Sequence, residues 1–196
     1  MTTQISFGNA YQLLVKDFLR ILEFIAPCDD NLATYSHRLY ELLLRTATEF
    51  ENFCKYSLQE RSLLPSGRSP NINDYKQLES SWGNEQIEVG LLFWQPKKYI
   101  KPFDGWSTNA PPLAWYKAYN EVKHNRELKF SCASLENVTL AIAGLFLALS
   151  TEFRNSHSFF NPYETMSSQK GIGHPEYSET FINNSIFSIR KPKLVV

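Results

Sequence analysis

The feature that most constrains the fold of this chain is a helical repeat of apolar residues between about residues 32 and 59. Its members recur every three or four positions, as they do on one face of an α-helix: Leu32, Tyr35, Leu39, Leu42, Leu43, Thr46, Phe50 and Phe53. The preceding segment has the same spacing, with Asn9 as its expected N-cap and Pro27 after its end. Residues 29–31, Asp-Asp-Asn, are expected to cap the second helix. The short break between the segments predicts an antiparallel helical hairpin.

A third apolar segment lies between Val138 and Leu149 and is interrupted only by Thr139. Because a membrane-spanning helix needs about 20 apolar residues, this shorter run predicts a core helix, with Ser134 as its N-cap. The first residues lack the basic and apolar runs of a secretion signal. Three widely spaced cysteines predict free thiols in a reducing compartment. These features favour a cytoplasmic protein without a membrane partner.

Shorter elements are expected between these helices. Residues 64–70, rich in Pro and Ser, predict a loop, and Asn73 is expected to cap a short helix that Gly83 ends. Residues 87–94 are β-branched and aromatic and are followed by prolines, which predicts a strand or a small hairpin. Near the end of the chain, residues 186–190 alternate as a strand does.

The fold class predicted from these elements is mainly α. We expect an antiparallel helical bundle with a small β-containing insertion near residues 85–103 and a C-terminal extension that packs on the body. Residues 1–154 are expected to form the helical domain, and residues 155–196 the extension.

The charge balance limits the function classes. The chain has 20 Lys and Arg against 20 Asp and Glu, a formal net charge of zero, which argues against a protein that coats long nucleic acid but allows local basic patches. The sequence contains no HExxH, no paired CxxC and no clustered Asp motif. We therefore expect no metal site and no cofactor.

The strongest functional signal is the segment Trp115-Tyr-Lys-Ala-Tyr-Asn-Glu-Val-Lys-His-Asn-Arg126, on a helix expected to open at residues 111–112, Pro-Pro. Helical geometry puts Trp115, Ala118, Tyr119 and Val122 on one face and Tyr116, Asn120 and His124 on the opposite side. His124 has cations close by at Lys123 and Arg126, a composition typical of a site that binds phosphate and transfers protons. The other interpretation is a solvated polar helix face.

This segment resembles the HEPN superfamily of helical domains, as does Glu41-Leu-Leu-Leu-Arg-Thr-Ala-Thr-Glu-Phe-Glu51. The resemblance covers roughly residues 9–154 in helix order. It implies an antiparallel bundle that forms a homodimer and, in many members, a metal-independent endoribonuclease of toxin–antitoxin or antiviral defence systems. The family's hallmark is an arginine, a polar residue and, after about four to six intervening positions, a histidine. His124 matches the histidine and Asn120 the polar residue, whereas Tyr119 stands in the arginine's place at the shortest spacing and Lys117 at the longest.

The resemblance also implies roles for these residues. His124 would be the acid or base, and Asn120 would orient it or the RNA. The charge of the phosphorane would be stabilised by Lys117, Lys123 and Arg126, and by Arg45 if it lies against the motif helix. The alternative is a non-catalytic dimerisation or interaction module, which binds a protein partner and in which the motif with Tyr119 is degenerate.

Two further groups allow two interpretations each. The first is a charged group on the second helix: Arg38, Glu41, Arg45 and Glu49. It forms either an intrahelical ion ladder, through Glu41–Arg45 and Arg45–Glu49, or a site in which Arg45 supplies the cation that the motif lacks at Tyr119. Residues 94–103, Trp-Gln-Pro-Lys-Lys-Tyr-Ile-Lys-Pro-Phe, interleave cations with aromatic rings, which suits either single-stranded nucleic acid or the packing of a hairpin. His37 has no ligand set that the sequence identifies.

Overall fold

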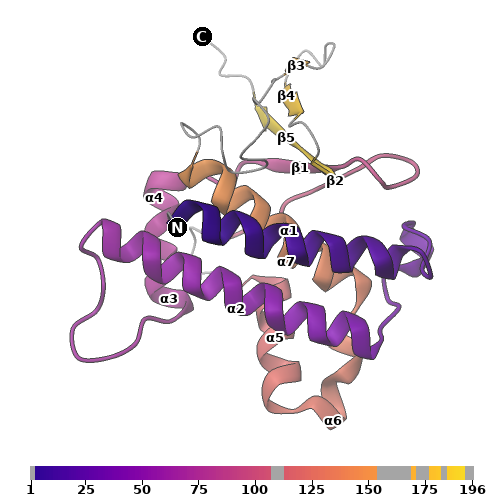
Figure 1. Cartoon of the computed structure of the whole chain (residues 1–196), viewed down its shortest axis with the longest axis horizontal. Coiled ribbons are helices and arrows are strands. Elements are labelled where there is room, and N and C mark those ends of the chain that lie inside the picture. The colour runs from indigo at the N-terminus through magenta and orange to yellow at the C-terminus, as the bar shows by residue number, and fades with distance from the viewer. Residues whose placement is uncertain (1–2, 107–112, 154–168, 171–176, 182–184, 193–196) are drawn as a thin grey trace.

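The computed structural model describes residues 3–106, 113–153, 169–170, 177–181 and 185–192. The body of the molecule is formed by four longer helices, α1 (Thr3–Leu22), α2 (His37–Glu60), α5 (Ala114–His124) and α7 (Leu135–Glu152). α1 and α2 lie side by side on one face, α7 lies behind them, and α5 packs on α2 and α7 (Figure 1). A small antiparallel sheet lies along one edge of these helices (Figure 1). The prediction of a mainly helical protein with a small β part is confirmed.

Helices α1 and α2 begin at different residues from those that the sequence predicts. α1 begins at Thr3, before the expected cap at Asn9, and ends at Leu22. Residues 29–31 form the 3-10 helix η1 (Asp29–Asn31), and Ser36 caps α2 by accepting the N–H of Leu39 at 3.2 Å. The prediction that residues 29–31 cap α2 was therefore wrong. The physical reason is tertiary, because the Asp29 carboxylate accepts hydrogen bonds from Trp94 and Lys98 instead.

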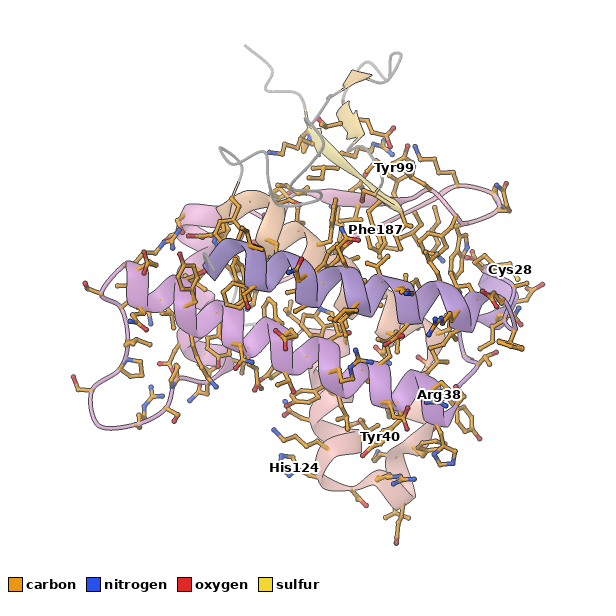
Figure 2. The ribbon with its side chains drawn as sticks, in the orientation of Figure 1. Cys28, Arg38, Tyr40, Tyr99, His124 and Phe187 are labelled. Carbon is orange, nitrogen blue, oxygen red and sulfur yellow. The ribbon has the colours of Figure 1, made fainter. Side chains whose placement is uncertain are left out.

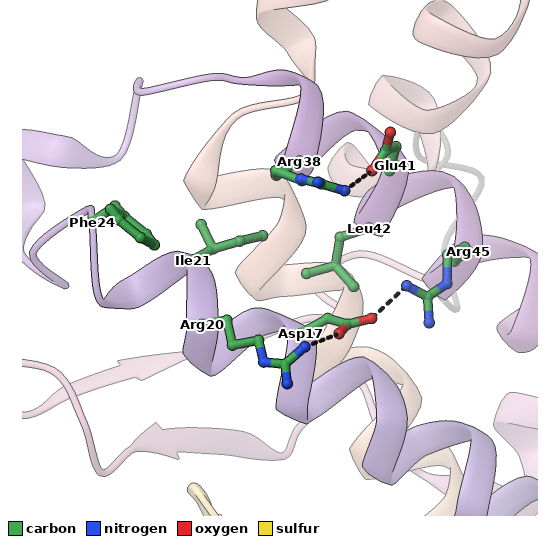
Figure 3. Close-up of a pocket in the computed structure, with 8 residues that line it drawn as sticks. All are labelled: Asp17, Arg20, Ile21, Phe24, Arg38, Glu41, Leu42 and Arg45. Atoms are coloured by element: carbon green, nitrogen blue, oxygen red, sulfur yellow. Dashed lines mark hydrogen bonds and ion pairs between the residues drawn. The ribbon is translucent and has the colours of Figure 1, made fainter.

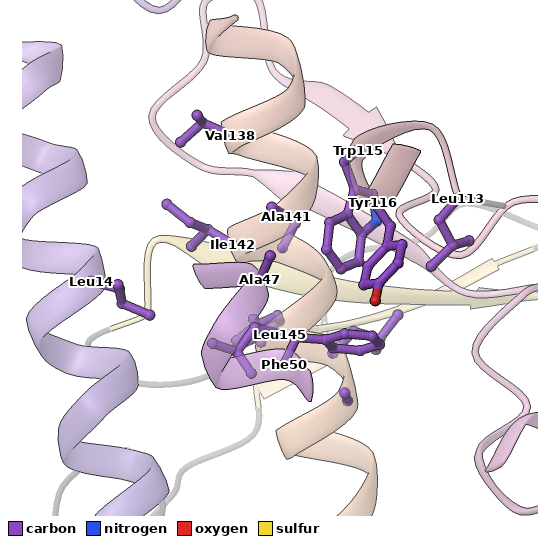
Figure 4. Packing of buried hydrophobic residues seen from close by; sticks show 14 of the residues in the cluster. Leu14, Ala47, Phe50, Leu113, Trp115, Tyr116, Val138, Ala141, Ile142 and Leu145 are labelled. Atoms are coloured by element: carbon purple, nitrogen blue, oxygen red, sulfur yellow. The ribbon is translucent and has the colours of Figure 1, made fainter. Parts of the chain in front are cut away.

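Helix α7 is the core helix that its composition predicts. Ser134 caps it by accepting the N–H of Asn137 at 3.3 Å. By length and composition α7 is the one candidate membrane span in the described part of the chain, but 72% of it is buried inside the molecule. Its apolar side chains pack against α1, α2 and α5, as Figure 4 shows for Ile142, Leu145 and their neighbours. Burial on nearly every side explains why its apolar residues form no single stripe.

Short helices join these elements. They are α3 (Ile72–Tyr75), η2 (Lys76–Leu78) and α4 (Glu79–Trp82), and after α5 come α6 (Arg126–Lys129) and η3 (Phe130–Cys132). Asn71 caps α3, two residues before the expected Asn73, and Asp74 completes the capping box. Gly83 ends α4 in the left-handed conformation at φ +63°, as predicted. The expected helix start at residues 111–112 lies outside the described residues.

The sheet joins the insertion to the C-terminal extension. Its strands are β1 (Glu88–Leu91), β2 (Lys98–Ile100), β3 (Gln169–Lys170), β4 (Tyr177–Phe181) and β5 (Phe187–Pro192), in the order β2-β1-β5-β4-β3. β1 pairs with β2 as the expected hairpin and also with β5, where Val89 lies opposite Ile189. The strand near residues 186–190 is therefore confirmed. It crosses the expected boundary at residue 154, because its partner β1 belongs to the insertion in the helical domain.

Aromatic side chains fill the space where α2, α5 and α7 meet. The ring of Phe50 lies 5.1 Å from that of Trp115, edge to face (Figure 4). The Trp115 Nε1–H donates to the Pro102 carbonyl at 3.0 Å. At the other end of the bundle, Arg61 forms two hydrogen bonds to Glu152, at 2.8 and 2.9 Å. The contacts of Trp115 hold α5 along one side, and its last turn reaches the edge of the molecule (Figure 1).

Candidate nucleic-acid interface

Helix α5 buries a wider face than its sequence predicts. Trp115, Ala118, Tyr119 and Val122 are buried as expected. Tyr116 is buried too, at 5% exposure, so its placement on the polar side with Asn120 and His124 was wrong. The reason is that α5 lies between two partners, and the Tyr116 hydroxyl donates to Glu51 Oε1 on α2 at 2.7 Å. Burial and the Glu51 carboxylate both raise the pKa of Tyr116, which keeps its hydroxyl protonated.

His124 is the last residue of α5 and is exposed, as its position predicts. Figure 2 shows it at the edge of the molecule, away from the bundle core. Asn120, one turn earlier, is half-buried, and Lys117 and Lys123 are exposed. The chain turns at Asn125, and Arg126 starts the separate helix α6. We call the polar side chains that these two helices present to solvent, in whole or in part, the α5–α6 corner: Lys117, Asn120, Lys123, His124, Arg126 and Lys129.

Tyr119, which stands in the place of the arginine, is only 2% exposed. Its hydroxyl accepts a hydrogen bond from Lys123 Nζ at 2.8 Å, and Nζ lies 4.9 Å from the centre of the Tyr119 ring. This hydrogen bond raises the pKa of Lys123. Lys123 is therefore held as a cation on the edge of α5, one position before His124.

Arg126 lies in a cluster of aromatic rings that we call the ring cluster: Tyr35, His37, Tyr40 and Phe130. Its guanidinium lies 5.0 Å from the Tyr40 ring and 5.8 Å from the Phe130 ring, and its Nη2 lies 3.4 Å from His37 Nδ1. His37 in turn packs on Phe130 with ring centres 4.8 Å apart. Tyr35 is 51% exposed, so the cluster is open to solvent. The sequence did not reveal this cluster, because 89 positions separate His37 from Arg126.

Arg45 does not belong to this site. It lies on the side of α2 that faces α1, where its Nη1 bonds to Asp17 Oδ2 at 2.6 Å (Figure 3). The prediction that Arg45 supplies a cation to the motif helix was wrong, because α5 packs on another face of α2. The expected ion ladder is also different: Arg38 pairs with Glu41 at 3.0 Å, and Arg45 pairs with α1.

Trp94, Lys97, Lys98 and Tyr99 of segment 94–103 are engaged in hairpin packing, whereas Lys101 is exposed. Lys98 Nζ and Trp94 Nε1 both donate to Asp29 Oδ1, at 2.8 and 2.9 Å, and the hydrogen bond from Lys98 lowers the pKa of that carboxyl. Lys97 and Tyr99 both donate to Glu179, at 2.6 and 3.0 Å. Carboxylates thus neutralise Lys97 and Lys98, and the structural interpretation of this segment is confirmed.

One acidic group near the corner, Glu121, is engaged in a hydrogen bond. Glu121 Oε2 accepts a hydrogen bond from the Cys132 thiol at 3.1 Å, which lowers the pKa of Glu121. Burial, followed by this hydrogen bond, raises the pKa of Cys132 and keeps the thiol protonated. Among the residues that the structure describes, no group of three or more His, Cys, Asp or Glu side chains could hold a metal ion.

The α5–α6 corner thus presents cations and an imidazole, and Arg126 joins it to the aromatic rings of the ring cluster. Together they can contact phosphate and bases. We found no protein-family model that matches the sequence, and no curated protein or solved structure that is similar to it at a significant level.

Proposed function

We propose that this protein is directed at RNA and binds a single strand at the α5–α6 corner. The observation that carries the proposal is Arg126, which is held over the rings of Tyr40 and Phe130 two positions after the exposed His124. Residues 117–129 hold four Lys or Arg against two Glu, and one of these glutamates accepts the thiol hydrogen bond. Cations contact the phosphates of a single strand, and exposed rings stack on its bases.

We further propose that the chain is a HEPN-like, metal-independent endoribonuclease of the toxin or antiviral defence type, acting in the cytoplasm. In such cleavage the 2′-hydroxyl oxygen attacks the adjacent phosphorus, the 5′-oxygen leaves, and a cyclic phosphate remains. His124 takes the proton from the 2′-hydroxyl or gives one to the leaving oxygen. Asn120 orients it, and Lys117, Lys123 and Arg126 stabilise the negative phosphorane.

A second candidate is a non-catalytic RNA- or protein-binding module, and Tyr119 is the observation that favours it. The residue in the arginine's place is buried and carries no charge, and it holds Lys123 by a hydrogen bond. A lysine held in this way has fewer donors left for a phosphorane, and it lacks the planar fork of an arginine.

Binding is tested by fluorescence anisotropy with a labelled single-stranded RNA of mixed sequence. We expect Arg126→Ala and Tyr40→Ala to weaken binding about tenfold each, since stacking contributes about 1–3 kcal/mol per base. Arg126→Ala should also reduce the slope of log affinity against log salt by about 1. Lys101→Ala, an exposed cation on the hairpin, is the control and should bind as the wild type does. Wild-type protein that fails to bind this RNA would overturn the proposal.

Cleavage is tested on the same RNA in EDTA. We expect activity that survives the chelator and is lost in His124→Ala, because the proposed chemistry is proton transfer. Binding without cleavage would select the second candidate. Tyr119→Arg is then informative, provided that its thermal unfolding is measured as well, because Tyr119 is buried.

A further inference from the structure

A groove between α1 and α2 lies outside the α5–α6 corner. Its first part is a hollow of about 300 Å³ lined by Asp17, Arg20, Ile21, Phe24, Arg38, Glu41, Leu42 and Arg45 (Figure 3). A second hollow of about 300 Å³ continues it toward the start of α1 and shares Arg45. The second hollow is lined by Leu13 and Leu14 on α1 and by Thr48 and Glu49 on α2, among others. The groove therefore follows both helices for most of their shared length.

The two ends of this groove carry exposed apolar side chains. Phe24 is 87% exposed, the largest value for a large hydrophobic residue in the described part of the chain, and Leu13 is 59% exposed. Leu13, Asp17 and Arg20 lie on one stripe of α1, which ends at Leu22. Phe24 continues this spacing in the turn that follows the helix, where its N–H donates to the Ile21 carbonyl at 3.0 Å. Exposed apolar groups at both ends with charges between them are typical of a surface that another helix covers.

The residues on this stripe are complementary to those of an identical stripe that runs in the opposite direction. Leu13 and Phe24 are equally distant from the point midway between residues 18 and 19, and so are Asp17 and Arg20. If a second copy of α1 lies antiparallel across this point, Leu13 meets Phe24 of the second copy and Asp17 meets Arg20. The reciprocal contacts form as well, as an isologous interface requires.

The charged residues of α2 are self-complementary in the same way, about a midpoint that lies beside the midpoint of the α1 stripe. Arg38 and Glu49 are equally distant from the point between residues 43 and 44, and Glu41 and Arg45 are equally distant from it to within one residue. The Asp17–Arg45 ion pair shows that α1 and α2 are level at these positions. One twofold axis therefore places Arg38 opposite Glu49 and Glu41 opposite Arg45 while it also brings the two copies of α1 into register.

We propose that a second copy of this chain covers the α1–α2 face, related by a twofold axis that lies in the face and runs perpendicular to both helices. α1 has 20 residues, so the face is about 30 Å long at 1.5 Å per residue. Two packed helices are about 20 Å wide. The resulting flat area of about 600 Å² approaches the roughly 800 Å² per partner of a standard interface.

This arrangement has a consequence for the rest of the molecule. α5 and α6 lie beyond one edge of the α1–α2 face (Figure 1). A rotation about an axis perpendicular to the helices within the face keeps that edge on the same side, so both α5–α6 corners lie along one edge of the dimer. The interface itself is independent of the proposed RNA binding, and its test measures only mass.

Sedimentation velocity of the full chain at roughly 1–100 μM covers the range of a micromolar dimer. We expect the wild type to be dimeric at the upper end. Phe24→Glu should raise the dimer Kd at least tenfold, because it places a charge at an apolar contact on both sides of the axis. Leu128→Glu is the matched control, since Leu128 is 78% exposed but lies on α6, and it should dimerise as the wild type does.

Two charge reversals test the register. Asp17→Arg places two arginines face to face at each contact, and Arg20→Asp places two aspartates there, so each variant alone should be a monomer at concentrations where the wild type is a dimer. An equimolar mixture of the two variants should restore the dimer, because each arginine of one variant then meets an aspartate of the other. A monomeric wild type at 100 μM (roughly the upper limit for a micromolar Kd) would overturn the proposal. So would a dimer that neither Phe24→Glu nor the single reversals weaken, or a mixture that stays monomeric.

Discussion

At the scale of single residues, the environment of a side chain decides its role more than its type does. Tyr119 occupies the arginine's place in the motif, yet it is buried and serves as an acceptor for Lys123. Arg45 lies in a segment that carries the resemblance, yet it bonds to α1. The charge available at the α5–α6 corner is therefore that of Lys117, Lys123, Arg126 and Lys129, held on exposed turns.

Gly90 shows the same dependence on environment in the sheet. A Cβ at this position would overlap Ser188 Oγ on β5 and lie 3.1 Å from the Tyr99 ring and 3.2 Å from Glu179. We expect Gly90→Ala to lower the free energy of unfolding by about 1–3 kcal/mol, as overpacking does, measured by urea denaturation. In the Ser188→Ala background the same substitution should cost less, because the nearest clashing atom is gone. Equal costs in the two backgrounds would contradict this explanation.

At the scale of elements, side chains that are close in sequence set the ends of helices and fasten the neighbouring loops to them. In α3, Asp74 accepts the N–H of Asn71 at 2.7 Å and two hydrogen bonds from Arg68, both at 2.6 Å. The Arg68 bonds lower the pKa of Asp74, although burial opposes them. This carboxylate therefore fastens the loop before α3 to the start of the helix.

Because the folded pKa of Asp74 lies below the ordinary aspartate value of 3.8, the stability that its carboxylate contributes is fully present above pH 3.8 and is lost as the pH falls through the folded pKa. We expect Asp74→Asn to be less stable than the wild type at pH 7 by about 1.5–3 kcal/mol, the range for a hydrogen bond to a charged group. The difference should shrink as the pH is lowered below 3.8. Thermal unfolding from pH 7 to pH 2.5 (roughly one unit or more below an ordinary Asp) measures it, and a constant difference would contradict it.

At the scale of the whole molecule, the sheet joins distant parts of the chain to the helical core. β5 lies between β1 and β4, and Phe187 on β5 is fully buried, with its ring 5.2 Å from Phe146 on α7 and 6.0 Å from Phe93 (Figure 2). The C-terminal strand is thus part of the core, as the prediction of a packed extension requires.

We expect Phe187→Ala to lower the free energy of unfolding by about 3–5 kcal/mol, as for other buried phenylalanines. Phe24→Ala is the matched control, because Phe24 is 87% exposed, and it should change the stability of the monomer by less than about 0.5 kcal/mol. Chemical denaturation at low protein concentration compares the two. A Phe187→Ala protein as stable as Phe24→Ala would mean that β5 does not contribute to the core.

The sequence by itself determined the local features of this protein. Apolar spacing located the long helices, Ser134 and Gly83 marked helix ends, and the alternation of residues 186–190 indicated a strand, because these signals depend on neighbours within a few positions. The exposure of His124 also followed from helical spacing. Whether the HEPN resemblance describes this protein stays a prediction.

Only the tertiary structure decided which distant residues meet. The pairing of β1 with β5, the capture of Asp29 by Trp94 and Lys98, and the ring cluster around Arg126 depend on segments that are 65 or more positions apart. Tyr116 was assigned to the wrong side for the same reason, since a helix between two partners buries more than one stripe. Helical periodicity records how much of a helix is apolar, whereas the direction from which each partner approaches is set by the packing of the whole chain.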